Sequence, residues 1–313
     1  LKEESLSMCG IAGILGEPEG GRIKAMLRVM RHRGPDQTGR FDDATGLCAL
    51  GHNRLSILDL SPAGCQPMVD ASGRYRVVFN GEIFNYLELR QELPDYPFKS
   101  QSDTEVLLAA YARWGERCLD KLIGIFAFAV WDTQEQTLFA ARDRFGVKPF
   151  YYAHGPHPQS LIFASEIKAV HAAGIPRVPD PENWALYLTR GTKQEGLNGT
   201  FWKDVQELTA GHQLCWRDGK TTIRRWYNLA QQTGDAYDPR PLEAVKEEYR
   251  SLLHDSIRLR FRADVPVGIC LSGGLDSATL LASVRAVQGT ESNVKAFTFV
   301  TGDPNYDERP WVE

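Results

Sequence analysis

The chain carries the stretch Met-Cys-Gly-Ile-Ala-Gly at residues 8–13. A lone cysteine is more often a small buried hydrophobic side chain than a nucleophile. The position of Cys9 favours the second role, because loss of the residues before it would make Cys9 the first residue of the mature chain. A terminal α-amine has a pKa of about 7.7–8.0 and can act as general base for its own thiol. We also expect Gly10 to let the chain turn tightly behind the cysteine.

Length and composition favour a globular chain of two domains. The chain has 313 residues, 42% of them apolar, and a formal net charge of −4 with acidic and basic residues interspersed. This balance gives no reason to expect nucleic acid or a membrane as partner, and no apolar run reaches the length of a membrane span. The six cysteines include no CxxC pair. We therefore expect neither a disulfide framework nor a zinc site, and a cytoplasmic location.

The first two-thirds of the chain have the pattern of short strands with a few helices. The apolar segments 76–79 and 125–131 have the composition of strands. Turn signals lie at Asn80-Gly81, at Asp218-Gly219 and at the glycines around Gly10 and Gly13. Ser102 and Glu105 are spaced as a capping box, followed by a helical face through residues 106–114. These features predict layered α and β structure with largely antiparallel sheets.

The composition changes near Asn228. Residues 228–241 are polar, contain a glycine and two prolines, and are typical of a linker. Helical periodicity at 242–257 is followed by a strand at 267–271, a helix at about 277–287 and a strand at 294–301. Strand, helix and strand in this order begin a parallel α/β sheet. One and a half such units cannot close a core, so we expect this second domain to be incomplete.

Several further stretches extend the motif at 8–13 into a family resemblance. The start is similar to that of class II glutamine amidotransferases, and the following stretches match in the same order: Arg-His-Arg-Gly-Pro-Asp (31–36), His-Asn-Arg-Leu-Ser-Ile (52–57), Phe-Asn-Gly-Glu-Ile-Phe-Asn (79–85), Ser-Asp-Thr-Glu (102–105), Arg-Asp-Arg-Phe-Gly-Val-Lys-Pro (142–149) and Ala-Ser-Glu-Ile-Lys (164–168). The stretch Ser-Gly-Gly-Leu-Asp-Ser (272–277) follows downstream. From residue 8 to about 308 the whole resembles a glutamine-hydrolysing asparagine synthetase.

The resemblance implies an α+β architecture in a definite order along the chain. An N-terminal extension or propeptide at 1–8 precedes a four-layer αββα N-terminal-nucleophile glutaminase domain at 9–226. A linker at 227–241 leads to the first part of an α/β parallel-sheet ATP pyrophosphatase domain at 242–313.

Two catalytic roles follow from the resemblance in addition to the Cys9 nucleophile. The side-chain amide of Asn80 and the N–H of Gly81 would form the oxyanion hole. Both are neutral donors that can be fixed in place before charge develops, which suits that task. Taken alone, Asn80-Gly81 is better interpreted as a hairpin turn.

Three residues are expected to bind glutamine. Arg54 resembles the arginine that grips the α-carboxylate, a task that suits a planar fork of donors, although it could be a surface cation. Asp103, with Glu82, would face the polar and cationic end of glutamine. Asp103 could also belong only to a helix N-terminus, where acidic side chains are favoured.

The Gly-rich stretch at 272–277 follows an apolar strand and opens a helix, an arrangement that binds phosphate. Its alternative interpretation is an ordinary strand-to-helix turn. It is not a Walker A loop, but it resembles the pyrophosphate loop of ATP pyrophosphatases, which release AMP and pyrophosphate. The residues expected at ATP are Leu271, Ser272, Gly273, Gly274, Asp276 and Ser277, with Asp276 also helping to hold phosphate-bound Mg²⁺.

The implied reaction couples two sites and leaves several points open. Glutamine acylates Cys9 and releases ammonia, which attacks a carboxylate activated by ATP; the first half needs no cofactor. The expected partners are L-glutamine, ATP and a carboxylate acceptor, with aspartate first and other acids as alternatives, and a homodimer is one expected assembly. If residues 1–8 persist, Cys9 lacks a free α-amine, and a catalytically silent regulatory or scaffold protein becomes the alternative.

Overall fold

The computed structural model describes residues 8–18, 20–157, 159–191, 199–234, 236–289, 292–300, 302–303 and 307–312. The chain forms two compact units, Leu1–Thr233 and Gly234–Glu313. The extension expected at 1–8 lies outside the described residues except for Met8.

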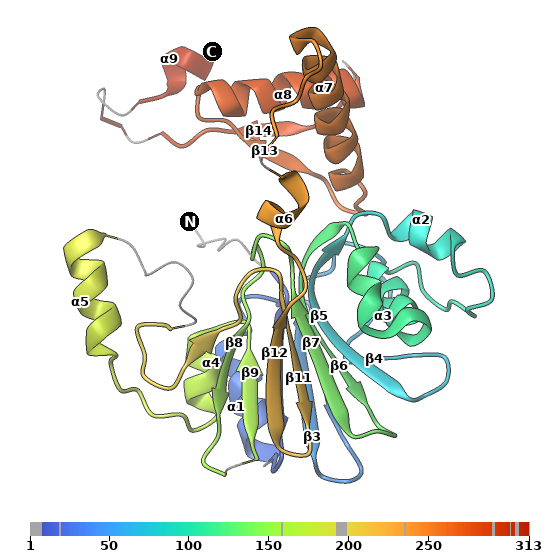
Figure 1. The fold of residues 1–313 in the computed structure, drawn as a ribbon, viewed down its shortest axis with the longest axis vertical. Coiled ribbons are helices and arrows are strands. Elements are labelled where there is room, and N and C mark those ends of the chain that lie inside the picture. The colour runs from blue at the N-terminus through green and yellow to red at the C-terminus, as the bar shows by residue number, and fades with distance from the viewer. Residues whose placement is uncertain are drawn as a thin grey trace. The chain divides into compact units, whose positions relative to one another are not determined.

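Two six-stranded sheets, antiparallel at every described pairing, form the centre of the first unit (Figure 1). The first sheet has the order β10 (Gln206–Glu207), β8 (Tyr151–His154), β9 (Leu161–Ala164), β1 (Gly10–Leu15), β3 (Cys48–Arg54) and β2 (Gln37–Asp42). The second has the order β12 (Lys220–Arg225), β11 (His212–Arg217), β7 (Thr137–Arg142), β6 (Gly124–Asp132), β5 (Tyr75–Ile83) and β4 (Met68–Val69).

Helices cover the outer face of each sheet. The first sheet is covered by α1 (Gly20–Val29) and α4 (Ile167–Ala172), and the second by α2 (Tyr86–Gln91) and α3 (Asp103–Trp114) (Figure 1). The unit also contains α5 (Pro181–Arg190), α6 (Leu229–Thr233) and the short 3₁₀ helices η1 (Pro62–Gly64) and η2 (Gly115–Asp120). The four layers are helix, sheet, sheet and helix, which confirms the expected αββα class. The α6 helix lies within the segment expected to be a linker.

An apolar layer fills the space between the two sheets. In β5, Val78 belongs to this layer, whereas Val77 and Phe79 pack on the helical side. Strand β6 alternates in the same way, and all its residues from 126 to 132 are buried. A sheet buried on both faces needs apolar side chains at every position, which explains why 125–131 is a continuous apolar run. The strands predicted at 76–79 and 125–131 are confirmed.

Two of the predicted turn signals are wrong. Asn80-Gly81 lies inside β5, paired with β6, and Gly10 and Gly13 lie inside β1. Packing requires glycine at position 13, since a Cβ there would lie 2.1 Å from the ring of buried Phe163. The turn at Asp218-Gly219 is confirmed: both residues have positive φ, 49° and 75°, and they join β11 to β12.

The start of α3 confirms one half of the predicted capping box. Ser102 is the N-cap, and its hydroxyl accepts a hydrogen bond from the N–H of Thr104. Glu105 does not return to Ser102; its carboxylate accepts hydrogen bonds from the N–H groups of Lys99 and Ser100. The glutamate therefore ties the preceding loop to the helix instead of capping the helix itself.

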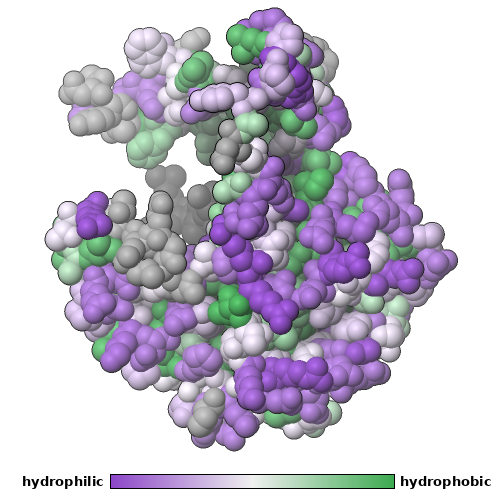
Figure 2. Space-filling model, in the orientation of Figure 1, coloured by the Kyte–Doolittle hydropathy of each residue, from purple (hydrophilic) through white to green (hydrophobic). Residues whose placement is uncertain are grey.

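The second unit contains the parallel arrangement predicted from the sequence. It consists of α7 (Leu242–Arg260), β13 (Gly268–Cys270), α8 (Leu275–Gln288), β14 (Lys295–Phe297) and α9 (Arg309–Val312). Strands β13 and β14 pair in parallel, and a small core forms around Ile257, Ile269 and Val284. Figure 2 shows hydrophilic side chains over most of the first unit on this face and more frequent apolar side chains on the second. Among the described residues no helix is both long and apolar enough to span a membrane.

We expect Gly13→Ala to destabilise the first unit. The added methyl group meets the ring of Phe163, which is stacked on Phe150 and cannot retreat. Overpacking of this kind lowers the free energy of unfolding by about 1–3 kcal/mol, measurable by urea denaturation. Gly21→Ala in α1 is the matched control, because nothing lies within 4 Å of its Cβ position. Equal stability of the two variants would show that the fit at Gly13 is looser than the structure indicates.

Candidate active site

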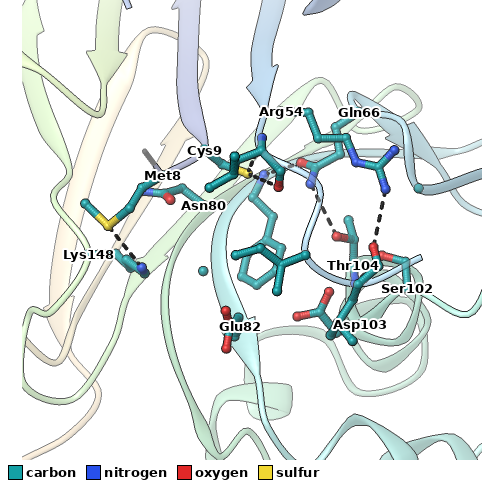
Figure 3. A pocket seen from close by; sticks show the side chains of 16 residues that line it. Met8, Cys9, Arg54, Gln66, Asn80, Glu82, Ser102, Asp103, Thr104 and Lys148 are labelled. Atoms are coloured by element: carbon teal, nitrogen blue, oxygen red, sulfur yellow. Dashed lines mark hydrogen bonds between the residues drawn. The ribbon is translucent and has the colours of Figure 1, made fainter. Parts of the chain in front are cut away.

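One pocket of the first unit gathers the residues singled out in the sequence (Figure 3). Its lining includes all six expected residues of this unit: Cys9, Arg54, Asn80, Gly81, Glu82 and Asp103. They come from both sheets and from α3, so segments far apart in the chain meet here.

Backbone contacts hold Cys9 just before β1. The Cys9 Sγ atom lies 3.4 Å from the N of Leu55 and 3.5 Å from its carbonyl oxygen. Arg33 donates from Nε to the carbonyl of Cys9 at 3.0 Å. Burial raises the pKa of the Cys9 thiol, and the charge of Asp103 adds to this, whereas the Leu55 N–H and nearby Lys148 and Arg54 oppose it.

Asn80 places an unsatisfied donor in the same pocket. Its side chain is 1% exposed, and Nδ2 has no hydrogen-bond partner within the described part of the chain. A buried amide N–H₂ without an acceptor costs about 1–3 kcal/mol. Strand alternation turns Asn80 to the same side as Val78, toward the sheet that carries Cys9. The donor is thus available for an acceptor that enters the pocket.

The N–H of Gly81 is directed toward the edge of β5 by the alternation of the strand. Phe79 and Ile83, two residues before and two residues after Gly81, donate their N–H groups to side chains at this edge. The acceptors are Gln66 Oε1 at 2.6 Å and Asp103 Oδ2 at 2.9 Å. Backbone groups two residues apart in a strand point the same way, so we infer that the Gly81 N–H points toward the same edge.

The position of Gly81 allows no side chain. An added Cβ would lie 2.2 Å from the carbonyl oxygen of Ile125 on β6. The paired residue Phe126 accepts a hydrogen bond from the Asp143 N–H and donates its own N–H to Asp143 Oδ2, both on the side away from β5, which leaves the Gly81 backbone facing away from β6. The close approach of the two strands therefore needs glycine here.

Asp103 is the first residue of α3, as the helix interpretation expected, and it also lines the pocket. The side chain is 5% exposed. Burial raises the pKa of its carboxyl group to about 7; the hydrogen bond from the Ile83 N–H opposes this, and the charge of Glu82 adds to it. A carboxylate desolvated in this way is stabilised when a cation enters beside it.

Arg54 lines the pocket with a guanidinium group that is held by a turn. It donates to the backbone carbonyls of Ser61 at 2.9 Å, of Leu58 at 3.3 Å, and of Asp59. These bonds fix the position of its positive charge but use several of its donors. A carboxylate bound here would therefore contact a positive charge that is already fixed in position.

Further lining residues were not identified from the sequence. Gln66 bridges the layers by accepting from Phe79 and donating to Thr104 Oγ1 at 3.3 Å. Lys148 lines the pocket opposite Asp103 in Figure 3. The only available signal was that Lys148 lies within a matched motif at 142–149, whereas nothing local marked Gln66.

The Gly-rich loop of the second unit joins β13 to α8 as expected. The hydroxyl groups of Ser272 and Ser277 lie 3.1 Å apart, and the Ser272 N–H donates to Ser277 Oγ. Gly273 has a φ of 70°, and Gly274 is the N-cap residue of α8. The loop therefore places two hydroxyl groups and the backbone N–H groups of a helix N-terminus together, a set that fits phosphate.

Asp276 lies exposed in the first turn of α8. Within the described ranges no three His, Cys, Asp or Glu side chains gather as metal ligands. A single carboxylate fits Mg²⁺ that is held mainly by nucleotide phosphates, and does not fit a site made by protein ligands alone.

Comparison with protein families assigns both units. Residues 8–227 match the glutamine amidotransferase domain, and residues 248–313 match the asparagine synthase domain.

Named relatives resemble the chain along nearly all of its length. It is 36% identical to asparagine synthetase [glutamine-hydrolyzing] 3 of Bacillus subtilis, over 98% of this chain and 52% of the relative. It is 35% identical to a putative asparagine synthetase [glutamine-hydrolyzing] of Methanocaldococcus jannaschii, over 98% and 62%. It is also 35% identical to the amidase chry2 of Gibberella zeae, over 91% and 44%. The chain thus spans about half the length of the curated relatives it matches.

A solved structure resembles the fold. The glutamine phosphoribosylpyrophosphate amidotransferase of B. subtilis aligns with a TM-score of 0.53 and 18% identity, over 93% of this chain and 65% of that one. At this identity the likeness concerns the fold alone.

We expect Asp103→Asn to make the Cys9 thiol more reactive. Removing a negative charge beside the thiol lowers its pKa, so alkylation by iodoacetamide at pH 8 should quicken about threefold. Mass measurement of the peptide containing Cys9 separates it from the other cysteines. Asp95→Asn on the exposed surface is the control and should leave the rate unchanged. A slower or unaltered rate in Asp103→Asn would contradict the proposed electrostatic contact.

Proposed function

The chain belongs to the family of glutamine-hydrolysing asparagine synthetases, and from this membership we propose that its first unit hydrolyses glutamine at Cys9 to supply ammonia for amide formation. We further propose the division into a glutaminase domain at 9–226, a linker at 227–241 and a synthetase part at 242–313.

The unpaired Nδ2 of Asn80 is the observation that carries this proposal. A buried donor without an acceptor is costly in a fold, and it lies in the pocket that Cys9 lines. An oxyanion formed during attack by Cys9 would supply the missing acceptor, with the Gly81 N–H as second donor. Donors held ready before charge develops stabilise the transition state more than the ground state.

The charges of the pocket match those of free glutamine. Arg54 would hold the α-carboxylate, while Asp103 and Glu82 would face the α-ammonium group. These contacts would direct the side-chain amide toward Cys9, between the thiol and the Asn80 donor. Fixing the two reacting groups in this way lowers the entropic cost of the reaction.

The chemistry requires Cys9 to be the terminal residue. The α-amine takes the thiol proton, the sulfur attacks the amide carbon, and the carbonyl oxygen becomes negative. Collapse of this intermediate releases ammonia with the transferred proton and leaves a thioester, which water hydrolyses to glutamate. With Met8 attached, the nitrogen of Cys9 is an amide and cannot accept a proton.

The second unit would contribute to ATP binding. Ser272, Gly273, Gly274 and Ser277 would hold phosphate beside Leu271, and Asp276 would contact phosphate-bound Mg²⁺. ATP, when bound, supplies the leaving group that activates the acceptor carboxylate for attack by ammonia. We propose aspartate as the first acceptor to test, with other carboxylates next, and a homodimer in the cytoplasm as the working assembly. The intact pocket argues against a silent scaffold.

We expect Asn80→Ala to slow glutamine hydrolysis about 10²–10³-fold, mainly in kcat, because one oxyanion donor is lost. Ammonia release is measured with a chain whose first residue is Cys9. Cys9→Ala sets the background rate, and Asn228→Ala, whose side chain lies outside the pocket, is the control. A loss below about threefold in Asn80→Ala, or turnover in Cys9→Ala, would refute the assigned roles.

Glutamine binding should weaken as the pH falls below about 7, the pKa to which burial raises the Asp103 carboxyl group. Below this value the group is neutral and no longer attracts the α-ammonium, so the Kd should rise by up to about tenfold per pH unit. Calorimetry on the inactive Cys9→Ala variant between pH 5.5 and 8 isolates binding from chemistry. Asp103→Asn should bind weakly at all pH values, and a wild-type-like slope in that variant would assign the titration elsewhere.

A further inference from the structure

The backbone of Lys148 is held on both sides by buried charged residues. Asp143 accepts the N–H of Lys148 at 3.0 Å, and Arg142 donates from Nε to the Lys148 carbonyl at 2.7 Å. Asp143 is 1% exposed and Arg142 7% exposed. Arg142 also donates to the carbonyl of Gly146, so the whole loop from 143 to 148 is braced. The structure therefore fixes where the Lys148 side chain begins.

The ammonium group of Lys148 lies in the pocket of the nucleophile, against Met8. The side chain lines the same pocket as Cys9, and its Nζ lies 3.3 Å from Sδ of Met8 (Figure 3). A thioether is a weak acceptor and carries no charge. Met8 is bonded to the nitrogen of Cys9, so the ammonium group contacts the side chain of the residue that precedes this nitrogen.

We propose that Lys148 is a fixed positive charge that activates Cys9, by stabilising the thiolate as its proton leaves and by keeping the α-amine neutral until it accepts that proton. This inference rests on the proposed glutaminase function and adds a residue to that site. The loop 142–149 would then serve to place this charge.

One cation favours both partners of the reaction. A nearby positive charge stabilises the thiolate, which is the nucleophilic form, and disfavours protonation of the α-amine, which must be neutral to act as base. A negative charge at the same place would harm both. The charge thus increases the fraction of enzyme that is ready for attack at neutral pH.

Other charges in the pocket act on the same two groups. Cys9 faces Asp103, Lys148, Arg33 and Arg54, and Lys148 faces Glu82, Cys9, Arg33 and Asp143. Asp103 opposes the effect of Lys148 on the thiol, but the α-ammonium group of bound glutamine would compensate Asp103. Burial lowers the pKa of Lys148, and the charge of Glu82 opposes this and helps to keep it protonated.

The pH profile of glutamine hydrolysis tests the inference in a chain that begins at Cys9. In Lys148→Met, the acid limb of kcat/KM should move up by about one pH unit, and kcat at pH 7 should fall about tenfold. Lys148→Arg keeps the charge and should restore the limb. Lys203→Met, on the exposed surface, is the matched control, and melting curves show whether each variant is folded. The inference would be overturned if the acid limb of kcat/KM stayed in place in folded Lys148→Met, or if Lys148→Arg failed to return that limb to its original pH.

A second measurement does not depend on turnover. The rate of Cys9 alkylation against pH, followed on the Cys9 peptide, reports the pKa of the thiol, which should rise by about one unit in Lys148→Met but not in Lys203→Met. If the unmutated chain released no ammonia, the glutaminase proposal would fail while this arm still decided the effect of Lys148. An unchanged thiol pKa would overturn the inference even in an active enzyme.

Discussion

The apolar layer between the two sheets sets the distance on which the pocket depends. Cys9 precedes a strand of the first sheet and Asn80 lies in the second, so their separation is decided by how closely the sheets pack. Large side chains such as Trp131 and Phe163 fill this layer and are fully buried. Interiors packed at this density resist small displacements, which keeps a donor and a nucleophile in fixed relation.

A hydrogen bond between the sheets supports the same alignment. His52 on β3 donates from Nε2 to the carbonyl of Phe79 on β5, at 3.0 Å, because a carbonyl oxygen can only accept. Burial lowers the pKa of His52 to about 3, so the ring stays neutral over the whole neutral range. The bond lies one residue from Asn80. Because the His52 ring stays neutral, this bond does not change as the pH changes around neutrality.

The pocket combines opposite charges instead of carrying one sign. Arg54 and Lys148 face Asp103 and Glu82 around a half-buried thiol. A zwitterionic ligand can satisfy both signs at once, whereas a simple anion or cation would leave one set uncompensated. Burial raises the pKa of the Asp103 carboxyl group to about 7, and the charge of Glu82 in the same pocket adds to this, so a positive charge placed beside Asp103 would favour its ionised form.

The sequence by itself determined the layered class, the buried strand at 125–131, the helix from Ser102 and the parallel start of the second unit, because each depends on local periodicity or capping. It also identified the six pocket residues, but only through motifs matched in order. It misjudged Asn80-Gly81 and Gly13, since a glycine needed for close packing has the same local pattern as one needed for a turn. Only the tertiary structure shows that Asn80 Nδ2 has no hydrogen-bond partner among the described residues, that the pKa of Asp103 is raised, and that Lys148 lies in the pocket. These properties depend on burial and on charges brought together from distant segments, and no local stretch of sequence contains that information.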